Sequence, residues 1–157
     1  MAMQLALRLL SLRARSRREL KLALDRRGFA EPQQEAVLAR LGELGYVDDV
    51  RFARDRASAL LRGGRLGPRA VLQRLFAHGL SEEQARQALS HAEREVGMDP
   101  LEAARSVLKR RGFVAQPLEP KQRAKAARLL RARGFADATI EELLGSEAEL
   151  DLPPRDG

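Results

Sequence analysis

The stretch LKLALDRRGF, residues 20–29, recurs in outline as VLQRLFAHGL at 71–80 and as AARLLRARGF at 126–135. In each copy a basic segment ends in a glycine followed by a large apolar residue, and the three glycines are 51 and 55 residues apart. Apolar residues eight and four positions before a glycine lie on one face of a helix. Glycine adopts the left-handed conformation that ends many helices, and the next apolar residue packs back on the last turns. The pattern therefore predicts three equivalent helix ends.

Each copy is predicted to be the middle helix of a three-helix repeat. The apolar positions that the copies share are Leu20, Val71 and Ala126, then Leu24, Leu75 and Leu130, and, ten residues after the glycine, Leu38, Leu89 and Leu144. The expected helices of the first repeat cover about 2–14, 16–28 and 31–45. Those of the second begin at Asp48 or Asp49, at Pro68 and at Ser81, and those of the third cover about 99–111, 121–133 and 137–145. Ser16 and Ser81 are expected to form capping boxes with Glu19 and Gln84.

These repeats predict an all-α fold of three tandem three-helix, helix-turn-helix-like repeats in an elongated, curved array. The expected boundaries are 1–47, 48–97 and 98–146, followed by a flexible acidic tail at 147–157. Composition agrees, because the 157 residues include only nine β-branched ones, which is too few for a sheet-based core. Units of about 45 residues are marginal when isolated, so neighbouring units should pack end to end.

Several functional classes lack the residues they need. The chain has no cysteine, which removes disulfides, thiol nucleophiles and thiolate metal sites, and it has only two histidines. The N-terminal apolar stretch is interrupted by Arg8 and is too short and too basic for a membrane span or a secretion signal. We therefore expect a soluble, cytoplasmic protein that is not an enzyme, holds no metal or cofactor and does not bind membranes.

Charge is distributed with the same period as the helices. Basic residues number 29, of which 25 are arginine, against 22 acidic residues, giving a net charge of +7. Net charge alternates as +6, −4, +6, −4, +9 and −6 over residues 1–30, 31–50, 51–80, 81–104, 105–134 and 135–157. Codon bias explains the choice of arginine but not this alternation. Stacked in register, the repeats would present a basic stripe and an acidic stripe; alternatively, acidic third helices simply pair with basic helices of adjacent units. The basic excess points to nucleic acid or an acidic protein as partner.

The remaining candidates for chemistry have structural interpretations. The pair Asp48-Asp49 lacks further ligands at helical spacing and is best interpreted as a helix cap. His78 is expected in the last turn of a basic helix, where the dipole favours it, and His91 on an exposed acidic helix. The glycines of 63–68 lack the Gly-Lys-Ser/Thr ending of a phosphate loop, although the arginines around them can contact phosphate with help from the next helix N-terminus.

Basic residues near helix ends and loops are the candidates for binding DNA. They are Arg17, Arg18, Arg62, Arg65, Arg69, Arg110 and Arg111, and the candidates for a protein partner are Glu82 and Glu83. Pairs such as 16–28 and 31–45 resemble a helix-turn-helix, which leaves a freestanding DNA-binding protein or repressor as an alternative. The second helix of each pair is rich in glutamate, however, and a major-groove recognition helix should not present that charge to phosphate. An α-helical adaptor for an acidic protein is a third possibility.

Motifs in order along the chain resemble the RecX family, regulators of the RecA recombinase. The resemblance is strongest in Leu44-Gly45-Tyr46-Val47-Asp48-Asp49, Arg51-Phe52-Ala53, Gly67-Pro68-Arg69, Leu75 and Gly79-Leu80-Ser81. The first repeat matches through residues 6–11, 16–20, Leu24 and Gly28, and the third matches loosely through Ala103-Ala104, Lys125-Ala126 and Arg133-Gly134-Phe135. Coverage is roughly 5–145.

This resemblance implies three tandem three-helix repeats and no catalysis. It also implies binding in the groove of the RecA–single-stranded DNA filament and suppression of ATP hydrolysis, strand exchange and coprotease activity. We expect the protein to be a monomer. Binding to bare single-stranded DNA is expected to be weak and non-specific.

Overall fold

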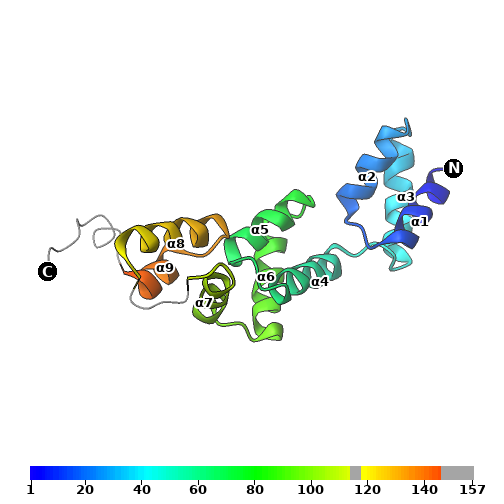
Figure 1. The fold of residues 1–157 in the computed structure, drawn as a ribbon. Helices are drawn as coiled ribbons and strands as arrows, with labels where there is room; N and C mark the ends of the chain where they lie inside the picture. Colours follow the sequence, from blue (N-terminus) through cyan, green and yellow to red (C-terminus); the bar gives the residue numbers. More distant parts are fainter. Residues whose placement is uncertain (114–117, 146–157) are drawn as a thin grey trace, which may run out of the picture.

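The computed structural model describes residues 1–113 and 118–145, which form nine α-helices with no strand among them (Figure 1). The helices are α1 (Ala2–Leu12), α2 (Arg17–Arg26), α3 (Glu31–Glu43), α4 (Asp49–Arg62), α5 (Pro68–Ala77), α6 (Glu82–Val96), α7 (Pro100–Arg110), α8 (Pro120–Ala132) and α9 (Asp137–Leu144). The predicted all-α class is confirmed. The acidic tail expected at 147–157 lies outside the described residues.

The helices pack in threes, which we call unit 1 (α1–α3), unit 2 (α4–α6) and unit 3 (α7–α9). The units follow one another along an elongated molecule, with unit 1 at one end and unit 3 at the other (Figure 1). Each unit buries an apolar cluster of its own. None of the helices that the structure describes combines the length and apolar character needed to cross a bilayer.

The repeated apolar positions form these cores. Side chains eight and four residues before each glycine have no exposed surface, and those ten residues after it are at most 7% exposed. Fully burying a leucine stabilises a fold by about 1.5–3 kcal/mol, so these positions contribute much of the stability of each unit. The helical periodicity found in the sequence is therefore confirmed.

The three repeated glycines end their helices in the same way. Gly28, Gly79 and Gly134 have φ values of 82°, 84° and 87°, in the left-handed region. In the third copy, the Phe135 N–H donates to the Leu130 carbonyl at 3.0 Å and the Gly134 N–H to the Arg131 carbonyl at 3.1 Å, and the other two copies repeat both bonds. This is the Schellman motif that the sequence predicts.

The middle helices α2, α5 and α8 are arranged head to tail, so that each repeated glycine of units 2 and 3 meets the preceding unit (Figure 1). At the unit 2–3 junction, the N–H groups of Gly67 and Arg69 donate to the carbonyls of Arg133 and Gly134, at 2.7 and 2.9 Å. Gly67 and Gly134 are in such close contact that a Cβ on Gly67 would lie 2.6 Å from the Gly134 oxygen. Two backbone hydrogen bonds and this close approach therefore hold the end of α8 against the start of α5.

The unit 1–2 junction is built from side chains around His78, which ends α5. Ser16 Oγ donates to the His78 carbonyl at 2.7 Å, and the Glu19 carboxylate contacts His78 Nδ1. The Phe52 ring meets the imidazole edge to face at 5.1 Å. Ser16 caps α2 as predicted. The predicted capping box is only half formed, because the Glu19 carboxylate contacts His78 and pairs with Arg13 at 2.9 Å instead of returning to the Ser16 N–H. The predicted Ser81–Gln84 box is complete.

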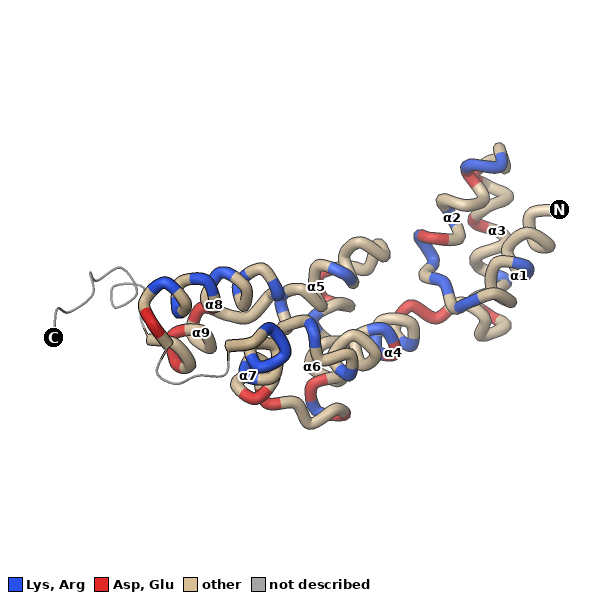
Figure 2. The backbone as a smooth tube through the Cα atoms, viewed as in Figure 1, with Lys and Arg blue, Asp and Glu red and all other residues tan. Residues whose placement is uncertain are grey.

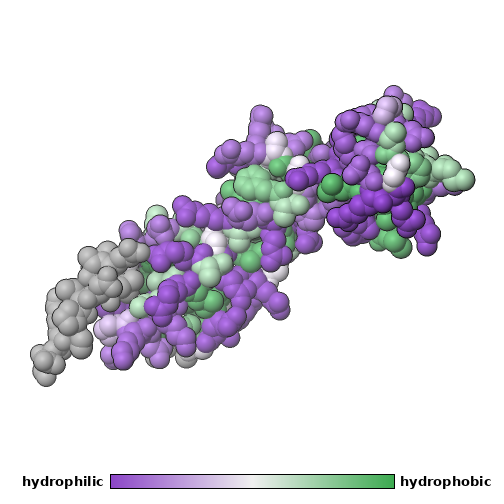
Figure 3. Space-filling model, turned by 90° about the horizontal axis from the view of Figure 1, so that it is seen from above, coloured by the Kyte–Doolittle hydropathy of each residue, from purple (hydrophilic) through white to green (hydrophobic). Residues whose placement is uncertain are grey.

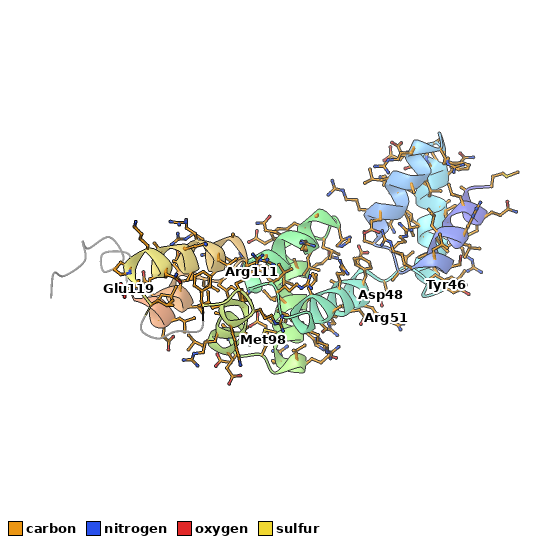
Figure 4. The ribbon with its side chains drawn as sticks, viewed as in Figure 1. Tyr46, Asp48, Arg51, Met98, Arg111 and Glu119 are labelled. Atoms are coloured by element: carbon orange, nitrogen blue, oxygen red, sulfur yellow. The ribbon has the colours of Figure 1, made fainter. Side chains whose placement is uncertain are left out.

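The two aspartates that precede α4 serve different helices. Asp48 caps α4 by accepting from the Arg51 N–H at 3.2 Å, as the sequence indicates (Figure 4). Asp49 accepts from the backbone N–H of Arg17 at 2.8 Å and so caps α2 across the junction. Both carboxylates are accounted for by backbone amides, and no group of three or more acidic, His or Cys side chains among the described residues could hold a metal ion.

Candidate nucleic-acid interface

The charged side chains follow the helices in the way that the sequence suggests. Figure 2 shows Lys and Arg along α8, at the end of α7 and on α4, and Asp and Glu on α3, α6 and α9. The face seen in Figure 3 is largely hydrophilic over all three units, with smaller hydrophobic areas between. A surface of this kind favours ligands that are recognised through charge.

The structure places the seven candidate arginines in different surroundings. Three of them, Arg65, Arg110 and Arg111, line one pocket of about 280 Å³ at the unit 2–3 junction, together with Gly64 and Val107. A fourth arginine, Arg133, completes the lining. We call the site lined by Arg65, Arg110, Arg111 and Arg133 the arginine pocket. Figure 4 shows Arg111 between α7 and α8.

Arg133 was missed as a candidate although it stands directly before a repeated glycine. The corresponding residue of unit 2 is His78, which is the centre of the other junction. In both junctions, the residue before the glycine therefore faces the preceding unit. Aligning the repeats would therefore identify Arg133 as a junction residue only if the head-to-tail stacking of the units were also known.

Gly64, the second glycine of the 63–67 loop, positions the Arg110 side chain. Arg110 Nη1 donates to the Gly64 carbonyl at 3.2 Å. Gly64 has φ +67°, and a Cβ there would lie 3.1 Å from the Arg110 guanidinium. An alanine at Gly64 would therefore strain the backbone and crowd this side chain.

Arg62 and Arg69 are less available than the sequence suggests. Arg62 pairs with Glu95 of α6 at 3.5 Å, and the Ser58 hydroxyl, which also bonds Glu95, is the main reason that the pKa of this carboxyl lies below its ordinary value. The Arg69 side chain is exposed, but its backbone N–H bonds Gly134. Since the Gly67 N–H bonds Arg133 as well, two of the amides at the α5 N-terminus, which the sequence interpretation made available to phosphate, are already used within the protein.

Arg17 and Arg18 lie at the unit 1–2 junction. Arg17 pairs with Glu35 of α3 at 2.7 Å. Glu35 also accepts from Lys21, which lowers the pKa of Glu35 and raises that of Lys21. The stem of Arg18 lies on Gly79, where a Cβ would come within 2.7 Å of Arg18 Cβ. Both arginines therefore already contact other residues of the protein, whether or not they also bind a ligand.

The acidic candidates are exposed, and their partners among the described residues lie within α6. Glu82 pairs with Arg86 at 2.9 Å and Glu83 accepts from Gln87 at 3.3 Å. In the described part of the chain, the ion pairs that join third helices to other helices stay inside one unit. Pairing between adjacent units, the alternative explanation for the charge alternation, is not what these bridges show.

Comparison with known proteins gives the same family along nearly the whole chain. Two family models match: RecX, first three-helix domain, over residues 2–41, and RecX, second three-helix domain, over residues 48–89. The chain is 35% identical over 144 residues to the regulatory protein RecX of Syntrophotalea carbinolica, covering 90% of this chain and 93% of that protein. It is 37% identical over 134 residues to that of Thermus thermophilus, covering 85% and 83%.

A solved structure agrees with the fold. The crystal structure of RecX from Lactobacillus salivarius superposes with a TM-score of 0.74 at 20% identity, covering 97% of this chain and 96% of that one. A second crystal structure of regulatory protein RecX gives 0.76 at 23% identity, covering 91% and 70%. These two likenesses concern the arrangement of all three units.

Proposed function

The chain belongs to the RecX family of regulatory proteins, and from that membership we propose that it is a negative modulator of the RecA recombinase. In this proposal it binds in the groove of the RecA–single-stranded DNA filament and suppresses ATP hydrolysis, strand exchange and coprotease activity. The observation that carries the proposal is the match to regulatory RecX proteins over about nine-tenths of both chains. Regulation by binding is in keeping with a chain whose motifs include no nucleophile, base or cofactor loop.

The repeated architecture suits a repeated target. A filament groove presents the same surface at regular intervals, and three linked units can make several weak contacts with it at once. Linked contacts raise the effective concentration of each, and together they can exceed a single contact by roughly 10²–10⁴. In this proposal the basic and acidic side chains bind different partners. The arginines contact DNA phosphate, whereas Glu82 and Glu83 contact a basic surface of a RecA protomer.

The first test is ATP hydrolysis by the cognate RecA on single-stranded DNA. We expect the rate to fall when this protein is added at substoichiometric to equal ratios, because a ligand spanning several protomers acts on each of them. Co-sedimentation with the filament is the control for binding. An unchanged rate at saturating, filament-bound protein would show that the inhibitory assignment is wrong.

Binding to bare DNA distinguishes the repressor alternative. A net charge of +7 spread over three units should give weak binding with little sequence preference, and non-specific affinities of about 10⁻⁴–10⁻⁶ M are typical at physiological salt. The affinity should fall steeply as salt increases, in a titration followed by fluorescence anisotropy. A tight, salt-tolerant site in one duplex sequence would favour the freestanding repressor.

A further inference from the structure

We propose that the arginine pocket is a binding site for one phosphate group of a nucleic-acid backbone, held between units 2 and 3. The inference rests on the proposed function, because it names where a single strand contacts the protein. Its four guanidinium groups come from three segments, which are the 63–67 loop, the end of α7 and the end of α8. The planar, multiply donating guanidinium matches phosphate geometry better than any other side chain.

Nothing in the described residues neutralises this pocket. None of the four arginines forms an ion pair with a carboxylate of residues 1–113 or 118–145. The C-terminal ends of α4, α7 and α8 each supply a partial negative charge of about 0.5, which is well short of balancing four guanidinium groups. Like charges gathered in one pocket repel one another, and a bound anion would relieve that repulsion.

The pocket at the unit 1–2 junction provides the contrast. It has a volume of about 420 Å³ and is lined by Arg13 and Arg56, but Asp55 lies in the same lining and Arg13 already pairs with Glu19. There the protein supplies its own anions. The two junctions are equivalent positions in a repeated structure, so the absence of acidic partners from the described residues around the second pocket is a feature of that site rather than of the fold.

Size and preorganisation specify the ligand further. A volume of about 280 Å³ lies just below the range of about 300–1,000 Å³ that is usual for small-molecule sites. The pocket therefore has room for a phosphate group. Arg110 is already fixed by its bond to the Gly64 carbonyl, so less side-chain freedom is lost on binding.

A matched pair of variants tests the site. Arg133→Gln removes a pocket charge but keeps the backbone carbonyl that bonds Gly67, so the junction should persist. Arg128→Gln removes the same charge from an exposed position of α8 outside the pocket. For an oligonucleotide of about 20 thymidines, we expect an affinity loss of about tenfold for Arg133→Gln and at most about twofold for Arg128→Gln. Equal losses in the two variants would mean that only overall charge matters, and would overturn the proposal.

Direct observation of the arginine side chains separates the possible sources of phosphate. In NMR spectra of the whole protein, inorganic phosphate should shift the Nε–Hε signals of the pocket arginines saturably and leave that of Arg128 in place. The oligonucleotide should shift the same signals at lower concentration. A response to inorganic phosphate or nucleotide without a response to the oligonucleotide would contradict a backbone site, as would parallel, non-saturating shifts of all arginines. Either result would leave inhibition of RecA by the wild-type protein, and with it the proposed function, untouched.

Discussion

Replacing Gly134 by alanine is expected to destabilise the protein by about 3 kcal/mol, through two separate effects. Gly134 has φ +87°, and a residue with a Cβ pays about 1–2 kcal/mol in this left-handed region. The new Cβ would also lie 2.5 Å from Ala70 Cβ and 2.8 Å from Ala70 Cα, at the start of α5. Overpacking against a fixed neighbour costs about 1–3 kcal/mol, so the unit 2–3 junction should open or the helices should shift.

Two other glycines separate these effects. Gly28→Ala has the same backbone strain at φ +82° but meets nothing within 4 Å, so its loss should be only about 1–2 kcal/mol. Gly67→Ala has an ordinary backbone but collides with the Gly134 carbonyl, so its loss should come from packing alone. Urea denaturation of the three variants measures the losses. If Gly134→Ala were no more destabilising than Gly28→Ala, the result would contradict the close contact between Gly134 and Ala70 at the unit 2–3 junction.

The second large effect is expected from reversing charge beside the arginine pocket. Changing Arg62, Arg65 and Arg69 to glutamate lowers the net charge from +7 to +1 and places repulsion where phosphate would bind. We expect affinity for single-stranded DNA to fall about 100-fold, and filament binding to fall with it. Arg65 should account for more of the loss than Arg62, because Arg65 lines the pocket and Arg62 is partly held by Glu95.

The reversal of Glu82 and Glu83 to lysine is the complementary change. It adds positive charge, so affinity for bare DNA should stay equal or increase. Filament binding should nevertheless weaken if the acidic side chains contact RecA. Surface changes usually cost within about 0.5 kcal/mol, and circular dichroism would verify the fold first. A rise in filament binding that parallels DNA binding would show that the acidic stripe is only a solvated surface.

Features that depend on neighbouring residues could be predicted from the sequence. The helix ends at the repeated glycines, the caps at Ser16, Asp48 and Ser81 and the buried apolar positions all follow from local spacing. Each has its cause within about one or two helical turns, which is the range over which sequence patterns act directly. The grouping of helices by charge was visible for the same reason.

Features that depend on how the units meet could not be predicted in this way. Glu19 satisfies the spacing of a capping box, yet a histidine 59 residues away takes its carboxylate. Asp49 looks like a second cap for α4 but caps α2. Arg133 joins Arg65 in the arginine pocket only because α8 ends against α5. In each case, the competing partner comes from another unit, and local spacing contains no information about it.

The two junctions also differ in which substitutions they tolerate. At the unit 1–2 junction, a mutation of Ser16, Glu19 or His78 removes a side-chain partner, so change there requires compensation elsewhere. At the unit 2–3 junction two bonds run between backbone atoms, which every amino acid except proline can supply, and Arg110 adds one side-chain bond to the Gly64 carbonyl. Gly67 and Gly134 must stay small there. The two backbone bonds between unit 3 and unit 2 therefore do not depend on which side chains stand at positions 133 and 69. The sequence patterns of units 1 and 2 match family models over residues 2–41 and 48–89, whereas unit 3 lies beyond those matches and still completes the fold.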